Sequence, residues 1–331
     1  MSSAKNATYL LKQDGAEACR HETFHFFQSR GCANRAPRRL ASQHLVWQLH
    51  TGYSLHPKIE VRDGMTIADL GTGTGIWALQ LAPSLLPNSK IVGYDISDAH
   101  LPHKEYWPSN AEFGVLDSMK DVPESLEGQF DVVHIRMWAY IPRENDPSPL
   151  IRHAAKLLSK LKKSILYFVS FLGFIQFKID SWTKLTILFT GPGGYLQWED
   201  ARFGSFVTRG DAACEIRNML DRVHLPSKLD FQWLEELDQH VQSAGVGFEV
   251  LDAQYGTWAP HLRPLAISNT MLAMQNLGAA LDGLKQKFPS IPSQAEWLNS
   301  LEPLDASIGK LCGGQLYWPP VTLLARKYSQ A

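Results

Sequence analysis

Three glycines at alternate positions, following an aspartate, are the part of this sequence best suited to chemistry. Asp69 ends a short apolar run, and Gly71, Gly73 and Gly75 follow it closely. Glycines at this spacing allow the backbone to turn tightly and allow a ligand to lie against it. A helical pattern starts at once with Ile76, so the order of elements is strand, glycine loop and helix. That order is typical of the nucleotide-binding turn of a doubly wound α/β sheet.

The acid in front of the loop indicates which ligand the loop binds. A dinucleotide site has a third small residue at the position of Ile76, where the pyrophosphate meets the helix N-terminus. The carboxylate of Asp69 would repel a pyrophosphate, whereas it suits a cationic ligand. S-adenosylmethionine carries an ammonium and a sulfonium group and no phosphate. The loop therefore favours S-adenosylmethionine, and a nicotinamide oxidoreductase is the least favoured hypothesis.

Two further predicted strands also end in an acid. Residues 90–96 end in Asp95 and Ile96, and residues 111–117 end in Asp117. A carboxylate at the end of the second strand can accept hydrogen bonds from both hydroxyls of a ribose. The place of the third acid suits an adenine amino group. Acids that merely lie in solvent at strand ends are the alternative, but three of them beside a glycine loop favour a nucleoside-containing cofactor.

The remaining periodicities predict the strands and helices that position these residues. Further strand patterns occur at 130–136, 193–199, 248–255 and 322–327. Helical patterns occur through much of 1–65 and at 151–158, 211–240, 264–287 and 293–311. Strands and helices that alternate in this way predict an α/β domain, and 331 residues suffice for one such domain with a cap.

Six sequence motifs resemble those of one known family. They are YLL at 9–11, QHLVWQL at 43–49, DLGTGTGIW at 69–77, GYDISDAHLP at 93–102, FDVVHIR at 130–136 and PGGYLQWED at 192–200. On these residues the chain resembles the fungal class I S-adenosylmethionine-dependent methyltransferases of secondary-metabolite clusters, which include those of epipolythiodioxopiperazine mycotoxin pathways. The resemblance covers most of the chain. It implies a Rossmann-like seven-stranded sheet with six parallel strands, one antiparallel strand and helices on both faces. It also implies an N-terminal helical cap at 1–65 and a methyltransferase domain at 66–331.

The resemblance further implies the cofactor, S-adenosyl-L-methionine, without a metal. The residues that it assigns to cofactor binding are Asp69, Gly71, Gly73, Gly75, Asp95, Ile96, Asp117 and Ser118. The first four of them would surround the methionine moiety. Asp95 would bind the ribose hydroxyls, and Ile96 would pack on the adenine ring. Asp117 would meet the adenine amino group, with Ser118 beside it.

The acceptor side is less clearly marked. His134 lies at the end of the fourth predicted strand, where class I methyltransferases usually face the methyl group. Histidine side chains titrate near neutral pH, so we consider His134 as a catalytic base. A structural histidine whose ring nitrogens are satisfied by neighbours is the alternative. Trp138 and Tyr140 form either an aromatic wall or part of the core, and residues 198–200 either line the pocket or cap a helix.

The implied reaction is methyl transfer to an O, N or S atom of a small molecule in fungal secondary-metabolite biosynthesis. A methyltransferase-like regulator of secondary metabolism without a small-molecule acceptor is the alternative. The net charge of −1 and the absence of a block of like charges argue against a nucleic-acid partner. The four scattered cysteines fit a reducing compartment, and the polar first residues do not resemble a signal peptide. We therefore expect a cytoplasmic protein without a membrane partner, and we predict no oligomeric state.

Two segments interrupt this regular pattern. Residues 21–39 separate two stretches that together form one helical run, and residues 159–191 separate the helix 151–158 from Pro-Gly-Gly at 192–194. We predict that both are retained introns, because 19 and 33 residues correspond to 57 and 99 nucleotides and their end residues are compatible with splice signals. Removing both leaves 279 of the 331 residues. An added helix or a membrane-surface anchor is the alternative for the second segment, whose apolar part, 165–177, is shorter than the ~20 residues that span a membrane.

Overall fold

The computed structural model describes residues 35–142, 144–159, 163–167, 186–190, 193–307 and 314–328. The predicted YLL motif at 9–11 and most of the first interrupting segment therefore lie outside the described residues. Of the second interrupting segment, the model describes residue 159 and two short strands. The predicted cofactor-binding residues and His134 are all described.

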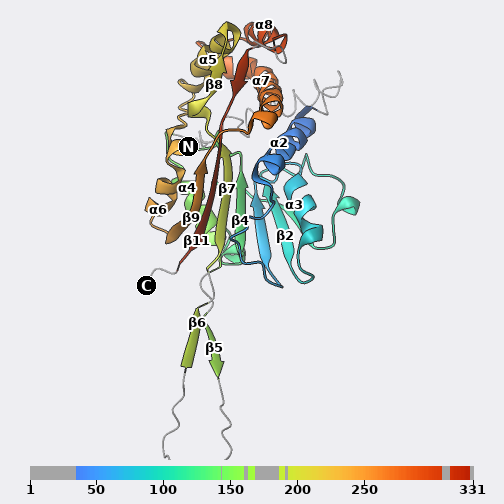
Figure 1. Ribbon diagram of the computed structural model, residues 1–331, viewed down its shortest axis with the longest axis vertical. Helices are drawn as coiled ribbons and strands as arrows, with labels where there is room; N and C mark the ends of the chain where they lie inside the picture. The colour runs from blue at the N-terminus through green and yellow to red at the C-terminus, as the bar shows by residue number, and fades with distance from the viewer. Residues whose placement is uncertain are drawn as a thin grey trace, which may run out of the picture.

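Seven strands form the central sheet, in the spatial order β3-β2-β1-β4-β7-β11-β9 (Figure 1). Their bounds are β1 Thr66–Leu70, β2 Lys90–Asp95, β3 Ala111–Val115, β4 Val132–Arg136, β7 Tyr195–Ala201, β9 Phe248–Tyr255 and β11 Pro320–Lys327. β11 runs antiparallel to both of its neighbours, whereas the other neighbouring pairs are parallel. The predicted sheet of six parallel strands and one antiparallel strand is thus confirmed. Because the six strands run the same way, their carboxyl ends share one edge of the sheet.

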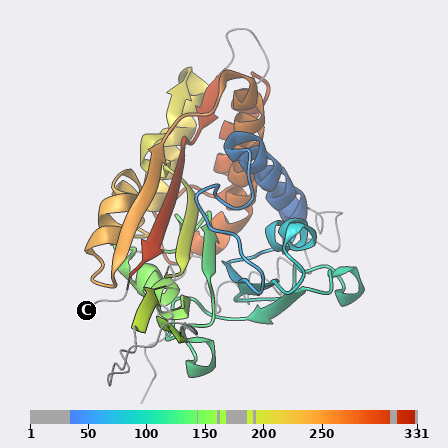
Figure 2. The ribbon, with the colours of Figure 1, turned by 60° about the horizontal axis from the view of Figure 1, so that its bottom comes forward.

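Helices cover both faces of this sheet, as predicted (Figures 1 and 2). α3, Ile76–Leu81, packs on one face. α4, Ser148–Leu157, and α6, Leu237–Ser243, pack on the other face. Successive side chains of a strand point to opposite faces, so Ile67 belongs to the first core and its neighbour Ala68 to the second.

Three helices and a two-stranded ribbon lie beyond one end of the sheet (Figure 1). We call them the cap; they are separate from the N-terminal segment 1–65 for which a helical cap was predicted. They are α5 Asp211–His224, α7 Arg263–Lys285, α8 Gln294–Asp305, β8 Val207–Arg209 and β10 Gln315–Tyr317. The cap has its own apolar core, in which the indole of Trp297 donates a hydrogen bond to the carbonyl of Met274 at 2.7 Å. α8 begins with a capping box between Ser293 and Glu296, which fixes where this helix starts.

Helix α2, Arg35–Thr51, contains the predicted helical motif at 43–49 and packs against the rest of the protein through an indole cluster. Trp47 is fully buried, with its ring 5.5 Å from that of Trp258 and 5.9 Å from that of Trp318. The predicted end of the first interrupting segment, at residue 39, falls inside α2. Asn269 of α7 donates to the carbonyl of residue 39 at 3.4 Å, so α2 also contacts the cap.

Ser159, the first residue of the second interrupting segment, lies beside Gly194, close to where β4 and β7 begin. The backbone N–H of Ser159 donates to the carbonyl of Phe130 at 2.7 Å, and that of Gly194 donates to the carbonyl of Ser159 at 3.4 Å. Between them, β5, Lys163–Tyr167, and β6, Thr186–Thr190, form an antiparallel hairpin outside the seven-stranded sheet (Figure 1). The chain therefore leaves the domain and returns to it at one place.

A buried histidine makes the stability of the fold depend on pH. His224, at the end of α5, is 4% exposed, and its Nε2 lies 3.0 Å from the hydroxyl of Tyr140. Burial, together with the charge of Arg217, lowers the pKa of His224 to about 3. In the unfolded chain a histidine titrates near pH 6.5. Its contribution to stability is therefore complete above pH 6.5 and is lost as the pH falls toward 3.

We expect this histidine alone to reduce the free energy of unfolding by about 2 kcal/mol between pH 7 and pH 5. Replacing His224 with glutamine should remove that part of the pH dependence, because the amide does not titrate. Urea unfolding at both pH values measures it. His103→Gln is the matched control, because the side chain of His103 is 76% exposed. Equal pH slopes in wild type and His224→Gln would show that His224 is not held neutral.

Candidate functional site

The glycine loop connects β1 to α3 and has a backbone that glycine adopts most readily. Gly71, Gly73 and Gly75 have φ angles of +70°, +60° and +73°, in the left-handed region. At two of these glycines a neighbouring ring also lies where a side chain would begin. A Cβ atom at Gly71 would lie 2.5 Å from the indole nitrogen of Trp138, and one at Gly75 would lie 2.7 Å from the ring of Phe113. A side chain at either position would therefore displace a neighbouring ring or distort the loop.

Asp95, at the end of β2, faces this loop. Its Oδ2 accepts a hydrogen bond from the backbone N–H of Gly73 at 2.8 Å, and its Oδ1 accepts one from that of Ser97 at 3.4 Å. Burial raises the pKa of Asp95, and the backbone hydrogen bonds oppose that rise. Asp95 and the following Ile96 are both half-buried. Two of the predicted cofactor-binding elements, the loop and the second acid, are thus in direct contact.

Asp117 and Ser118 follow β3 at the same edge of the sheet. Oδ1 of Asp117 accepts a hydrogen bond from the backbone N–H of Met119 at 3.0 Å, and Oδ2 lies 3.3 Å from the ammonium of Lys120. Asp117 is half-buried, whereas Ser118 is 4% exposed. Because β3 pairs with β2 on the side away from β1, the third acid lies one strand further from the glycine loop than the second.

Asp69 and His134 form a buried pair, because the register of β1 and β4 sets them side by side. Oδ1 of Asp69 lies 2.7 Å from Nδ1 of His134, and its Oδ2 accepts the hydroxyl of Thr72 at 2.6 Å. The imidazole stacks on the indole of Trp77 at 3.7 Å and is 1% exposed. Its Nε2 lies 3.7 Å from Oε2 of Glu199. A general base must reach the proton that it removes, and this ring is enclosed by two carboxylates and an indole.

A line of hydrogen-bonded polar side chains continues from this pair to helix α2 and ends at Gln80, which is exposed. Oε2 of Glu199 accepts Nε of Arg136 at 2.6 Å and lies 2.5 Å from its Nη2. Nη1 of Arg136 lies 3.0 Å from Nδ1 of His44, and Nε2 of His44 contacts the side-chain oxygen of Gln80 on α3. Burial raises the pKa of Glu199, but the charges of Arg136 and His134 outweigh it and hold the pKa at about 2. Glu199 therefore stays ionised inside the protein.

Asp200, the next residue, organises the turn that follows β4. Its carboxylate accepts the backbone N–H groups of Trp138 at 2.9 Å and Ala139 at 3.3 Å, and the indole N–H of Trp198 at 2.9 Å. Met137, at the start of this turn, has a φ of +59°, which is uncommon for a residue with a side chain. Burial raises the pKa of Asp200 to about 6, although these hydrogen bonds act against the rise. The carboxylate holds the turn in a conformation that the backbone alone disfavours.

Trp138 and Tyr140, the aromatic residues of this turn, are both half-buried and both pack against the main apolar core, but their other contacts differ. The indole of Trp138 donates to the carbonyl of Leu70 at 3.0 Å, so it also lies against the glycine loop. The ring of Tyr140 is 4.9 Å from that of Phe203 and 5.2 Å from that of Phe231. Only Trp138 is in a place to border a ligand on the loop.

The described part of the chain contains no group of three or more histidine, cysteine, aspartate or glutamate side chains arranged to hold a metal ion. Over the same residues, no helix has both the length and the apolar composition needed to cross a membrane.

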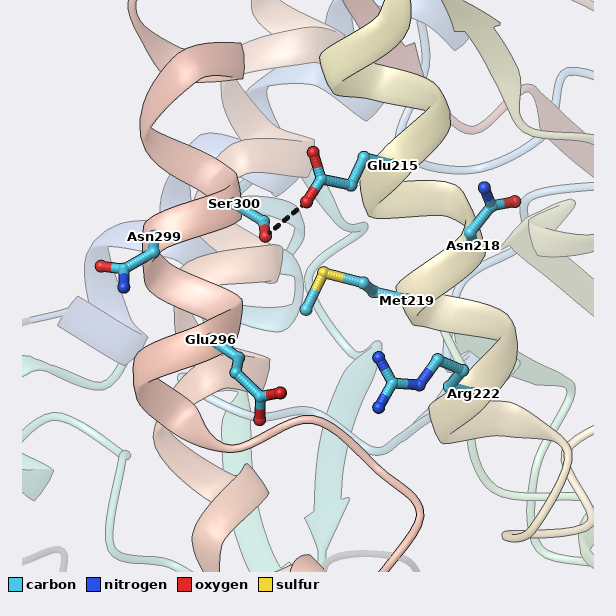
Figure 3. A pocket seen from close by; sticks show the side chains of 7 residues that line it. All are labelled: Glu215, Asn218, Met219, Arg222, Glu296, Asn299 and Ser300. Carbon is cyan, nitrogen blue, oxygen red and sulfur yellow. Dashed lines mark hydrogen bonds between the residues drawn. The ribbon is translucent and has the colours of Figure 1, made fainter.

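A separate groove of about 510 Å³ lies between two helices of the cap (Figure 3). Its lining residues are Glu215, Asn218, Met219, Arg222, Glu296, Asn299 and Ser300. The first four come from α5 and the others from α8, and Glu215 accepts the hydroxyl of Ser300 at 2.9 Å across it. None of these seven residues is among those predicted for the cofactor.

Comparisons with known proteins identify part of the chain. Residues 67–160 match a family model described as a methyltransferase domain. The chain is 29% identical over 200 residues to methyltransferase grgD of Penicillium sp, an alignment that covers 57% of this chain and 58% of grgD. It is 28% identical over 75 residues to N-methyltransferase verN of Clonostachys rogersoniana, covering 23% and 26% of the two chains. It is 39% identical over 77 residues to methyltransferase pytC of Aspergillus terreus, covering 23% and 22%. The chain thus spans less than two thirds of the length of each relative.

Proposed function

We propose that this chain is an S-adenosylmethionine-dependent methyltransferase. The premise is that residues 67–160 are a methyltransferase domain similar to those of fungal secondary-metabolite methyltransferases. Its acceptor in this proposal is a small molecule with a nucleophilic oxygen, nitrogen or sulfur atom. The relative verN is an N-methyltransferase, which supports nitrogen among the three.

The contact between the glycine loop and the second acid carries the proposal. The three left-handed glycines leave the turn after β1 without side chains, and Asp95 accepts a hydrogen bond from that turn. The two oxygens of Asp95 suit the paired hydroxyls of a ribose. Asp69 and Asp95 both place negative charge near the loop, which favours a cation over a pyrophosphate. These residues fit S-adenosylmethionine, which supplies an electrophilic methyl group when bound.

The contribution of this chain to the reaction is chiefly alignment and exclusion of water. Two turns provide it, namely the glycine loop after β1 and the turn of Met137 and Trp138 after β4. The indole of Trp138 joins them through its bond to the backbone of Leu70. We assign His134 to positioning rather than to proton removal, since its enclosed ring holds Asp69 and through it the loop residue Thr72.

Calorimetric titration of S-adenosylhomocysteine into the purified chain tests the proposal. A one-to-one complex would support it. A folded chain that fails to bind would contradict the proposal that S-adenosylmethionine is the cofactor. It would favour the alternative, a regulator without methyl transfer. The titration should be made with the 331-residue chain and, beside it, with a chain that lacks residues 160–191 and keeps Ser159.

Replacing Asp95 with alanine is expected to weaken this binding about 10- to 100-fold, because hydrogen bonds to a charged group contribute about 1.5–3 kcal/mol. Asp98→Ala is the matched control, because Asp98 is exposed and only three residues away. We expect the control to bind as the wild type does. Equal affinities of Asp95→Ala and Asp98→Ala would contradict the assignment of Asp95 to the ribose.

A further inference from the structure

We infer that Glu199 is a positioning residue that fixes helix α2 over the glycine loop through Arg136 and His44. By this device it sets how tightly the cofactor is retained, and it leaves the rate of methyl transfer nearly unchanged. The inference rests on the proposed function, because the ligand of the loop is taken to be S-adenosylmethionine. It assigns a role to the buried Glu199 and His44 and the half-buried Arg136, which do not themselves border the loop.

The first observation is the buried carboxylate of Glu199, which packing of the sheet does not explain. Glu199 is 1% exposed, and β7 pairs its residue position with that of Arg136 on β4. The guanidinium contacts one carboxylate oxygen with two nitrogens, at 2.5 and 2.6 Å, and Gln197 donates to the other oxygen at 2.9 Å. Burying such a pair is costly, and apolar side chains would serve packing equally well. The pair is therefore better explained by the contact of the third guanidinium nitrogen, Nη1 of Arg136.

That nitrogen holds α2. Nη1 of Arg136 lies 3.0 Å from Nδ1 of His44 on α2. Arginine has no acceptor, so Nδ1 of His44 must accept, and the ring must be neutral with its proton on Nε2. Nε2 then donates to the side-chain oxygen of Gln80, on the helix that starts directly after the loop. One imidazole thus joins α2 to the end of β4 and to α3.

The position of α2 matters because one of its side chains lies over the loop. Leu40 is four residues before His44, so the two lie on the same face of the helix. The Cδ1 atom of Leu40 is 3.3 Å from the place of a Cβ at Gly73. Toward the other end of α2, Trp47 packs on Trp258 and Trp318, and the Arg136 guanidinium also lies over its ring at 6.0 Å. We expect the two indole contacts to keep this end of α2 in place when the charges are lost. The hydrogen bonds of His44 therefore determine how closely Leu40 approaches the loop.

Loss of the Glu199 charge should therefore loosen the half of α2 that covers the loop. In Glu199→Gln the guanidinium of Arg136 loses its counter-charge. We expect it to move and to lose its hydrogen bond to Nδ1 of His44. His44→Leu removes the same connection from the other side, replaces the imidazole with an apolar side chain of similar size and leaves both strands intact. Leu45→Ala is the matched control, because Leu45 is next along α2 but 51% exposed.

The test measures binding of S-adenosylhomocysteine to the full chain by calorimetry, and its dissociation rate by the fluorescence of the protein's tryptophans. We expect Glu199→Gln and His44→Leu each to bind about tenfold more weakly, through faster dissociation, and Leu45→Ala to match the wild type. Once an acceptor is known, KM for the cofactor should rise by the same factor with kcat within about twofold.

Three results would overturn the inference. Wild-type affinity in both folded variants would show that the connection does not hold the helix. A fall in kcat with unchanged KM would place the two residues in the chemistry instead. A folded wild type that does not bind S-adenosylhomocysteine would overturn the proposed function and this inference together. If Glu199→Gln does not fold, His44→Leu decides by itself, since His44 lies outside the sheet.

Discussion

Replacing Gly71 with alanine is expected to weaken binding of S-adenosylhomocysteine by about 100-fold or more, which corresponds to at least 2.7 kcal/mol. Two causes act together. The φ angle of +70° costs a residue with a side chain about 1–2 kcal/mol. The new methyl group would also lie 2.5 Å from the indole nitrogen of Trp138, which is itself bonded to the backbone of Leu70. The indole must move, and the turn after β4 must move with it.

A matched control separates these two causes. Gly64 has a φ of +71°, and a Cβ there would meet no atom within 4 Å. Gly64→Ala therefore carries the same backbone strain without a collision, so it should lower stability by about 1–2 kcal/mol and leave binding unchanged. Calorimetry measures the affinities, and urea unfolding measures the stabilities. A Gly71→Ala chain that binds as tightly as Gly64→Ala would show that the loop does not contact the cofactor.

The strands could be predicted from the sequence because each carries its own signal. β9 was predicted at 248–255 and is found with those bounds, and β11 was predicted at 322–327 and begins two residues earlier, at Pro320. Apolar residues in short runs between turn residues define such elements without reference to the rest of the chain. The resemblance implied six parallel strands and one antiparallel strand, which the structure confirms, whereas the spatial order of the strands comes from the structure alone.

The directions of the strand-end acids could not be predicted, since they depend on register. Asp95 faces the glycine loop, whereas Asp69 turns inward because the pairing of β1 and β4 sets it beside His134. Residues 198–200 were predicted either to line the pocket or to cap a helix. The structure shows neither for Glu199 and Asp200, whose carboxylates hold Arg136 and the turn after β4 inside the protein. Their neighbours come from distant parts of the chain.

His44 and Gln80 show what sequence reasoning misses altogether. Both lie in predicted helical patterns, and His44 belongs to the motif at 43–49, but they are 36 residues apart and the sequence assigned neither a role. Their contact exists because α2 packs over α3, which depends on the indole cluster around Trp47. The turns that form the proposed site are thus held by two buried carboxylates of β7, Glu199 and Asp200, and by the neutral imidazole of His44 on α2. One signal in the sequence could have pointed to such residues. After the strand residues are assigned to the two faces of the sheet, some polar side chains fall at positions that should be buried, and these need polar partners inside the protein.

The second interrupting segment gives the other large expected effect. We propose that residues 160–191 do not belong to the functional protein, as the predicted intron at 159–191 implies, and that deleting them leaves the fold intact. The deletion joins Ser159-Pro192-Gly193-Gly194. In the structure the backbone N–H of Gly194 already donates to the carbonyl of Ser159 at 3.4 Å. In the shortened chain this bond would join the first and fourth residues of a β-turn with Pro-Gly at its centre, a sequence that such turns favour.

Ser159 should be kept in this variant, because its N–H donates to the carbonyl of Phe130, and a proline in its place has no N–H to donate. We expect the shortened chain to be about 2 kcal/mol more stable, because four halvings of the loop length each recover about 0.6 kcal/mol of closure entropy. We also expect higher solubility, since the deleted segment is rich in Phe, Ile and Leu. Urea unfolding and the soluble fraction after centrifugation measure the two effects, and calorimetry shows whether affinity for S-adenosylhomocysteine is kept.

A chain in which residues 160–191 are replaced by a glycine–serine linker of equal length is the matched control. It keeps the loop but removes the apolar side chains, so its solubility should rise while its stability stays near that of the 331-residue chain. If the deletion and the linker both unfold the protein or abolish binding, the segment is a working part of the domain. Mature transcripts that encode 160–191 without a gap would lead to the same conclusion, whereas transcripts that join the codons for 159 and 192 would establish the shorter chain as the native one.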